Sequence, residues 1–278
     1  MARQRSARFC IFCGAVAGSK EHIWSQWIHP LLPAREGDAR HSRVAIHFHP
    51  TEGESRRGPN NRQGDVRTIR VRAVCAACNN GWMNRCEEAV RPFLTPIICG
   101  EPVSLEADDL HRIAQWLAMK VMVAEHDTAQ ATLTPLAERV DLMDHGKLPT
   151  YYRFYVASNV GERALYFRRH SHCIALSKAG PQPPLEGTTK NVQVATFVIG
   201  KAIFQVTASR STEIVIEESS MVLGFHDKAR FWPSPESPKT FPAGPRLDDA
   251  GIDKIAGIID RLVTQGNVRW MPLGSEFR

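Results

Sequence analysis

Apolar residues recur at helical spacing in four segments of the chain, which are 21–32, 79–95, 105–125 and 248–265. The clearest is 105–125, where an apolar residue at every third or fourth position would form one buried stripe. We expect Ser104 or Asp108 to cap the N-terminus of this helix. Pro92 and Pro96 are expected to end the preceding helix, because proline has no backbone N–H to donate.

Alternation of apolar and polar residues, which is typical of half-buried strands, dominates the second half of the chain. The strands expected there are 151–158, 163–169, 192–200, 201–209 and 213–218. Gly200 and Lys201 separate two of these runs, as in a tight hairpin. Earlier in the chain, 66–74 alternates clearly. Residues 34–65 are rich in Arg, Gly, Asn and Pro and predict a solvated inserted loop, with weak strand character at 44–48.

Composition limits the class of protein. The chain has 278 residues, of which 43% are hydrophobic, so it can bury a substantial core, and wholesale disorder is excluded. A membrane span needs about 20 apolar residues, whereas the longest apolar stretch, 192–206, is interrupted at Gly200 and Lys201. Arginines before the stretch FCIFCGAVAG imitate a secretory signal, but a cysteine pair lies inside it, so we interpret this stretch as part of the fold.

The positive charge is concentrated in the first third of the chain. Residues 1–100 hold 15 basic and 8 acidic side chains, whereas 101–278 hold 20 and 21. All but one of the 15 are arginines, whose planar guanidinium binds carboxylates and phosphates through two hydrogen bonds. Arg67, Arg70 and Arg72 alternate along 66–74 and would line one edge of a strand. We expect phosphate contacts there, with nucleic acid as the partner.

Two Cys-x-x-Cys pairs, Cys10/Cys13 and Cys75/Cys78, account for four of the seven cysteines. Each pair can present two thiolates from a tight turn, and together they complete the tetrahedral shell of a structural Zn²⁺ ion. The alternative is a set of buried or redox-active thiols. The 61 residues between the pairs mean that the fold must bring them together. Because this usage suits a reducing compartment, we expect a cytoplasmic protein.

Polar residues follow each cysteine pair: Lys20-Glu21-His22-Ile23 follow the first, and Asn79-Asn80-Gly81-Trp82-Met83 follow the second. This order of Cys-x-x-Cys, Glu-His and Cys-x-x-Cys-Asn resembles the zinc-containing branch of the HNH endonucleases, also called His-Me finger or ββα-metal nucleases. The resemblance covers residues 8–95, and the segments CIFCG, SKEHIW and VCAACNNGWM look like a bacterial subgroup of that family.

The resemblance implies a zinc-braced treble-clef or ββα-metal module that hydrolyses phosphodiester bonds in DNA with a catalytic Mg²⁺ or Mn²⁺ ion. It implies His22 as the general base, with Glu21 and Asn79 as ligands of that ion. A neutral imidazole can accept a proton near pH 7, and a cation held by oxygen ligands can polarise the scissile phosphate. On a strand, the neighbours Glu21 and His22 would point to opposite faces, so a bulge or turn must bring both to the substrate.

Two features depart from the family. Its members have a further Asn shortly before the second cysteine pair, which orients the base; here Arg70 and Arg72 occupy that region, and Asn60 and Asn61 are the nearest candidates. The span from His22 to Asn79 is also longer than in compact members. The alternative hypothesis is therefore a zinc-stabilised nucleic-acid-binding or assembly module that does not cleave.

The expected fold class is α+β in two parts. A zinc-braced HNH-like nuclease domain is expected at 1–100, with an Arg-rich insert at about 34–65. A helical connector at about 104–147 and an antiparallel-sheet α+β domain are expected within 101–278. The second part carries no motif that assigns a role; it can carry a homodimer contact or bind a partner in a defence system, and no membrane partner is expected.

Overall fold

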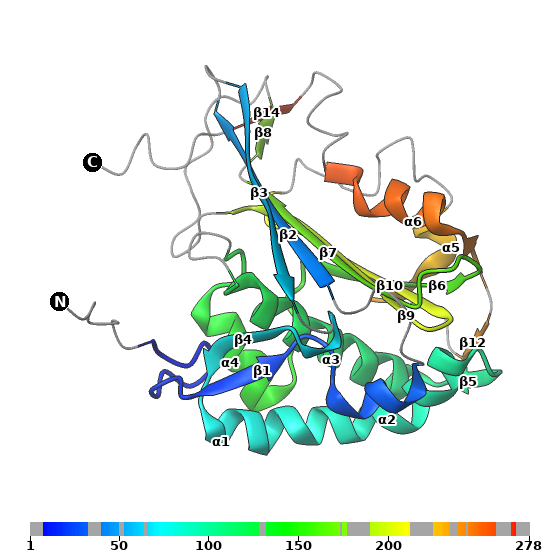
Figure 1. Ribbon diagram of the computed structural model, residues 1–278. Coiled ribbons are helices and arrows are strands. Elements are labelled where there is room, and N and C mark those ends of the chain that lie inside the picture. Colours follow the sequence, from blue (N-terminus) through cyan, green and yellow to red (C-terminus); the bar gives the residue numbers. More distant parts are fainter. Residues whose placement is uncertain are drawn as a thin grey trace.

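Helices and mostly antiparallel sheets make up the computed structural model, which confirms a mixed α+β fold (Figure 1). The structure describes residues 8–32, 40–49, 53–63, 66–127, 132–172, 174–176, 190–211, 225–233, 238–242, 244–259 and 268–270. Within these ranges, no helix is both long enough and apolar enough to cross a membrane.

The alternating segments of the second half form the central sheet, whose strand order is β11-β6-β10-β9-β7. Its antiparallel strands are β6 (Tyr152–Asn159), β7 (Leu165–His172), β9 (Val192–Ile199), β10 (Ala202–Ser209) and β11 (Arg230–Trp232). The short β13 (Arg246–Leu247) pairs in parallel with β6. The hairpin predicted at Gly200 is confirmed between β9 and β10. The strand predicted over 213–218 lies outside the described residues.

Both faces of this sheet are covered, so every residue of β9 is buried. Phe204 faces the cluster that contains helix α3 (Ala107–Glu125), whereas its neighbour Ile203 faces helix α6 (Asp249–Ala256). Figure 1 shows the two helices on opposite sides of the sheet. All residues of α3 from Trp116 to Glu125 are buried, so this helix forms the centre of the molecule.

A two-stranded sheet and a long helix precede α3. Strand β1 (Ser19–His22) pairs antiparallel with β4 (Arg70–Val74). The chain then forms α1 (Ala76–Cys78), a wide helical turn η3 (Asn79–Met83) and α2 (Asn84–Cys99). Helix α2 lies along α3, which places the N-terminal elements directly on the core helix.

The predicted end of the second helix is wrong, because α2 continues through Pro92 and Pro96 to Cys99. Each proline removes a backbone hydrogen bond. Val90 and Leu94 are fully buried in the cluster shared with α3, however, and this packing stabilises the helix across the prolines. Tertiary burial thus outweighs the local signal.

The insert at 34–65 is also not a loop over its described residues. Strands β2 (Arg40–His49) and β3 (Gly53–Gln63) pair antiparallel as a long hairpin. Strand pairing depends on backbone hydrogen bonds, and the many charged residues of this insert hide the alternation that would mark two strands. Asn60 and Asn61 lie on β3.

Two element starts differ from the prediction. The N-cap of α3 is Glu106, in a capping box with Asp109, rather than Ser104 or Asp108. The strand expected over 66–74 begins at Arg70, after a 3₁₀ turn η2 (Val66–Thr68). The start of α6 is as predicted, since Asp248 caps it through a bond from Gly251 N, whereas 260–265 lie outside the described residues.

Short elements complete the fold: η1 (Gln26–Leu31), β5 (Val103–Leu105) with β12 (Lys239–Phe241), α4 (Leu136–His145), β8 (Ile174–Leu176) with β14 (Val268–Trp270), and α5 (Phe225–Ala229). The expected domain boundary near residue 100 falls between α2 and β5. Buried side chains from both sides of it, such as Val74 and Phe204, belong to one hydrophobic cluster. The division into two domains stays a prediction.

Gly200→Ala is expected to destabilise the protein. The turn holds Gly200 at φ +58°, a region that costs other residues about 1–2 kcal/mol. An added Cβ would also lie 2.4 Å from the carbonyl oxygen of Ile98, which Lys201 N already binds at 2.9 Å. Thermal unfolding should show a clearly lower Tm. The control Gly18→Ala, whose Cβ would meet nothing within 4 Å, should change the Tm little, and equal Tm values for both variants would contradict the argument.

Candidate functional site

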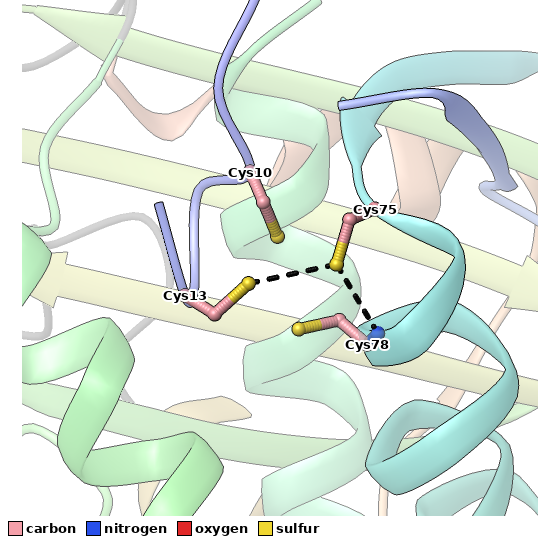
Figure 2. Close-up of side chains that lie close together, drawn as sticks. All are labelled: Cys10, Cys13, Cys75 and Cys78. Carbon is pink, nitrogen blue, oxygen red and sulfur yellow. Dashed lines mark hydrogen bonds between the residues drawn. The ribbon is translucent and has the colours of Figure 1, made fainter. Parts of the chain in front are cut away.

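The two cysteine pairs come together at one end of the β1–β4 sheet (Figure 2). One ligand atom from each of Cys10, Cys13, Cys75 and Cys78 lies within 4.8 Å of all the others. The Sγ atoms of Cys13 and Cys75 are 3.5 Å apart. A tetrahedral Zn²⁺ ion with Zn–S bonds of about 2.3 Å separates its sulfurs by about 3.8 Å. The four cysteines therefore fit a structural zinc ion.

Two tight turns aim these sulfurs at one point. In the first, Gly14 N donates to Cys10 O at 3.0 Å, with Gly14 at φ +74°. In the second, Cys75 precedes α1 and accepts a bond from Cys78 N at 3.4 Å. The turns are adjacent because Ile11 N donates to Ala73 O at 3.0 Å, which joins the first turn to β4.

The electrostatics of the cluster favour a bound cation. Burial and the neighbouring thiols raise the pKa of Cys78. Burial also acts to raise the pKa of Cys10, but backbone hydrogen bonds, first among them that from Cys13, outweigh it and lower this pKa to about 7. Four crowded thiols cannot all ionise without a counter-charge, and a divalent ion supplies it.

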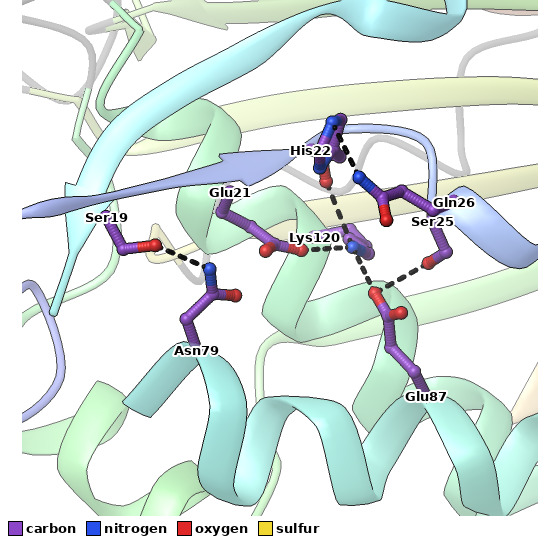
Figure 3. Close-up of polar contacts among 8 residues, drawn as sticks. All are labelled: Ser19, Glu21, His22, Ser25, Gln26, Asn79, Glu87 and Lys120. Carbon is purple, nitrogen blue, oxygen red and sulfur yellow. Dashed lines mark hydrogen bonds and ion pairs between the residues drawn. The ribbon is translucent and has the colours of Figure 1, made fainter. Parts of the chain in front are cut away.

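Glu21 and His22 lie next to each other on β1 but point to opposite sides of it (Figure 3). Glu21 is 6% exposed and faces helices α2 and α3, whereas the half-buried His22 ring faces away from them. The irregularity in the β1–β4 pairing lies between Ser19 and Glu21, and so it precedes the step from Glu21 to His22. It therefore does not bring the two side chains together.

Glu21 belongs to a buried ion group that the sequence did not reveal. Lys120 on α3, with 0% exposure, donates from Nζ to Glu21 Oε1, to Glu87 Oε1 at 2.6 Å and to the carbonyl oxygen of His22 at 3.0 Å. Ser25 Oγ donates to the same Glu87 oxygen at 2.6 Å. Burial alone would lower the pKa of Lys120, but the carboxylates of Glu21 and Glu87 raise it, so the ammonium stays charged.

Asn79 follows the second cysteine pair at the start of η3, on the same side of β1 as Glu21 (Figure 3). Its amide Nδ2 donates to Ser19 Oγ at 2.7 Å. The structure thus places Asn79 and Glu21 on one side of β1 and the His22 ring on the other. A metal held by Glu21 and Asn79 would not share a side of β1 with the imidazole.

The donor set does not fit the catalytic cation that the resemblance implies. A magnesium ion needs near-octahedral oxygen ligands and keeps several waters. Glu21 instead lies in the protein interior, and its Oε1 already accepts a hydrogen bond from the Lys120 ammonium. Asn79 donates to Ser19 through Nδ2 and so offers its Oδ1, but one amide oxygen does not replace the carboxylate that the ammonium occupies. We therefore derive no chemical step through a divalent ion at this position.

The other side of β1 carries the remaining candidates. His22 pairs in register with Arg70 of β4, whose side chain is exposed, as is that of Arg72. Burial lowers the pKa of His22, and electrostatic interactions with Arg70, Lys120 and His29 lower it further, against a smaller opposite effect of Glu87. The imidazole is therefore neutral near pH 7 and can accept a proton.

Two polar side chains stand close to the His22 ring. Gln26 Nε2 lies 3.4 Å from His22 Nε2, and the His29 ring centroid lies 6.4 Å from that of His22. Gln26 is thus an amide side chain that the structure places at this ring, whereas the expectation that Asn60 or Asn61 orients the ring stays a prediction. The sequence feature that could have pointed to Gln26 is its position four residues after His22, at the start of η1.

Arg67 departs from the predicted arginine edge. It lies in the 3₁₀ turn η2, half-buried, and its Nη1 donates to Leu32 O at 3.4 Å. Because the strand begins at Arg70, alternation does not extend back to Arg67. Of the three predicted arginines, Arg70 and Arg72 are the exposed pair on β4.

Zinc binding can be tested by metal analysis. We expect about one zinc ion per purified chain, and Cys75→Ser should lose it, because a tetrahedral site needs its full set of ligands. Loss of the ion should also lower the Tm, since metal binding and folding are coupled. Cys99→Ser, a change at an exposed cysteine outside the cluster, is the matched control and should keep both zinc and Tm. Zinc retained in full by Cys75→Ser would exclude this site.

Comparisons of the chain with models of protein families, with curated proteins and with solved structures find no match. Three groups of residues stand out in the structure: the four-cysteine cluster, the cross-strand pair of His22 and Arg70, and the buried group around Lys120.

Proposed function

We propose that this chain is an HNH-type endonuclease that hydrolyses phosphodiester bonds in DNA, with His22 as the general base. One observation supports this most directly: a neutral His22 lies opposite the exposed Arg70, on a strand pair that the cysteine cluster braces. We further propose that β1, β4, α1 and α2 form the treble-clef or ββα-metal module of that family, with one structural zinc ion.

In the proposed reaction the DNA phosphate lies over the exposed side of the β1–β4 sheet. Arg70 donates two hydrogen bonds to phosphate oxygens and offsets the charge that develops there. An imidazole nitrogen of His22 takes the proton of the attacking water as the new P–O bond forms. The bond from phosphorus to the leaving sugar oxygen breaks, and that oxygen takes a proton from solvent.

A non-catalytic nucleic-acid-binding module is the second candidate. The pairing of Glu21 with Lys120 favours it, because the carboxylate that the family uses for its cation is here bound to an ammonium. In that case DNA binding should depend on salt, should not change with Mg²⁺, and should occur without nicking. Plasmid nicking and DNA binding, measured on the same protein preparation, distinguish the two candidate functions.

His22→Ala is expected to lower the rate of plasmid nicking by about 100-fold or more, the usual contribution of a general base. The base must be unprotonated, and its pKa lies below the ordinary 6.5. The wild-type rate should therefore stay level above pH 6.5 and fall only at lower pH, as the imidazole takes up a proton. Initial rates across this pH range check the expectation. Nicking that survives in a folded His22→Ala protein would refute the assignment.

Arg70→Ala is expected to weaken DNA binding uniformly across sequences, because a phosphate contact positions the duplex without reading bases. The slope of log affinity against log salt should fall by about one. Fluorescence anisotropy at several salt concentrations measures both. Arg246→Ala removes the same charge from an exposed residue of β13 and is the matched control. If both variants lose affinity equally, binding depends on overall charge rather than on Arg70.

A further inference from the structure

We propose that the ammonium of Lys120 is the resident cation of this site, and that it takes the place of a divalent ion between Glu21, Glu87 and the His22 carbonyl oxygen. One consequence of this inference rests on the proposed function: cleavage by this chain would not use a metal bound to Glu21. The exclusion of the ion itself can be measured without any cleavage.

The contacts of Lys120 are those of a small cation. Its three N–H groups meet three oxygens that come from two elements: Glu21 Oε1 and His22 O from β1, and Glu87 Oε1 from α2 (Figure 3). An ammonium has three donors and no acceptor, so these bonds use its full capacity. Two carboxylates and a carbonyl are also the oxygen types that hard divalent ions select.

Lys120 cannot leave this position easily. It lies on α3, where its neighbours Met119 and Val121 are 0% exposed, and its own exposure is 0%. A divalent ion entering between Glu21 and Glu87 would have to displace the ammonium into an apolar core, where an unpaired charge is costly. The ammonium is tethered to the helix, and so it competes with any free ion at a large advantage.

The same group also contacts the backbone of the neighbouring residue His22. Its bond to the His22 carbonyl oxygen, at 3.0 Å, fixes the backbone of β1 to α3 at the residue that carries the imidazole. The ammonium lies on one side of β1, and the His22 ring points to the other (Figure 3). Arg70 of β4 pairs with His22 in register.

Titration with Mn²⁺, followed by electron paramagnetic resonance, tests the exclusion directly on zinc-loaded full-length protein. The wild type is expected to show no Mn²⁺ site that depends on Glu21. Lys120→Met should create one, with a Kd of about 0.1–1 mM, because it frees two carboxylates at one place. That site should disappear in Lys120→Met combined with Glu21→Gln. Lys228→Met, which removes an exposed lysine on α5, is the control and should resemble the wild type.

Each outcome decides the proposal. A wild-type Mn²⁺ site that Glu21→Gln abolishes would overturn it, as would a folded Lys120→Met protein that binds no Mn²⁺. If circular dichroism shows that Lys120→Met does not fold, the comparison of the wild type with Glu21→Gln decides alone, and equal Mn²⁺ binding by both supports the exclusion. A lack of nicking under all conditions would refute the nuclease proposal but not this one, since the Mn²⁺ titration does not require activity.

Discussion

The ion group around Lys120 is the interaction on which the arrangement of the N-terminal elements depends. It joins β1, α2 and α3 through one buried nitrogen. Charges in a protein interior are tolerated when each has its partners, and removal of one partner typically costs about 3–5 kcal/mol. The β1 strand is consequently fixed at Glu21 and His22. The apolar contacts of α2 with α3 hold the carboxylate of Glu87 within reach of Lys120.

The cysteine cluster fixes the opposite end of the same strand pair. It brings the turn at Cys10 and Cys13 next to the start of α1, beside the β1–β4 pair in which His22 lies opposite Arg70. Both devices act on a two-stranded sheet, which is marginally stable by itself. The side of the sheet that faces the helices is buried, and the other side carries the exposed Arg70 and Arg72.

The sequence predicted those parts of the molecule whose chemistry is carried by residue identity and close spacing. The cysteine pairs are recognisable as ligands wherever the chain places them, and the β9–β10 hairpin is specified by Gly200 and the runs around it. The sequence shows Lys120 as a single charge in the apolar run LAMKVMVA, which marks it as an unusual residue. Its partners depend on how α2 packs against α3, so the sequence alone does not identify them. The side of β1 that Glu21 faces likewise depends on tertiary contacts and was left open by the sequence.

The position of Lys120 in the chain has a consequence for the order in which the site is assembled. During synthesis, all four zinc cysteines and both carboxylates leave the ribosome before Lys120 does, since the last of them, Glu87, precedes it by 33 residues. The nascent chain can bind zinc while its acidic pair is still solvated and without a cation. Burial of that pair has to wait for α3, so the strand that carries Glu21 and His22 reaches its final position only after the core helix has been made.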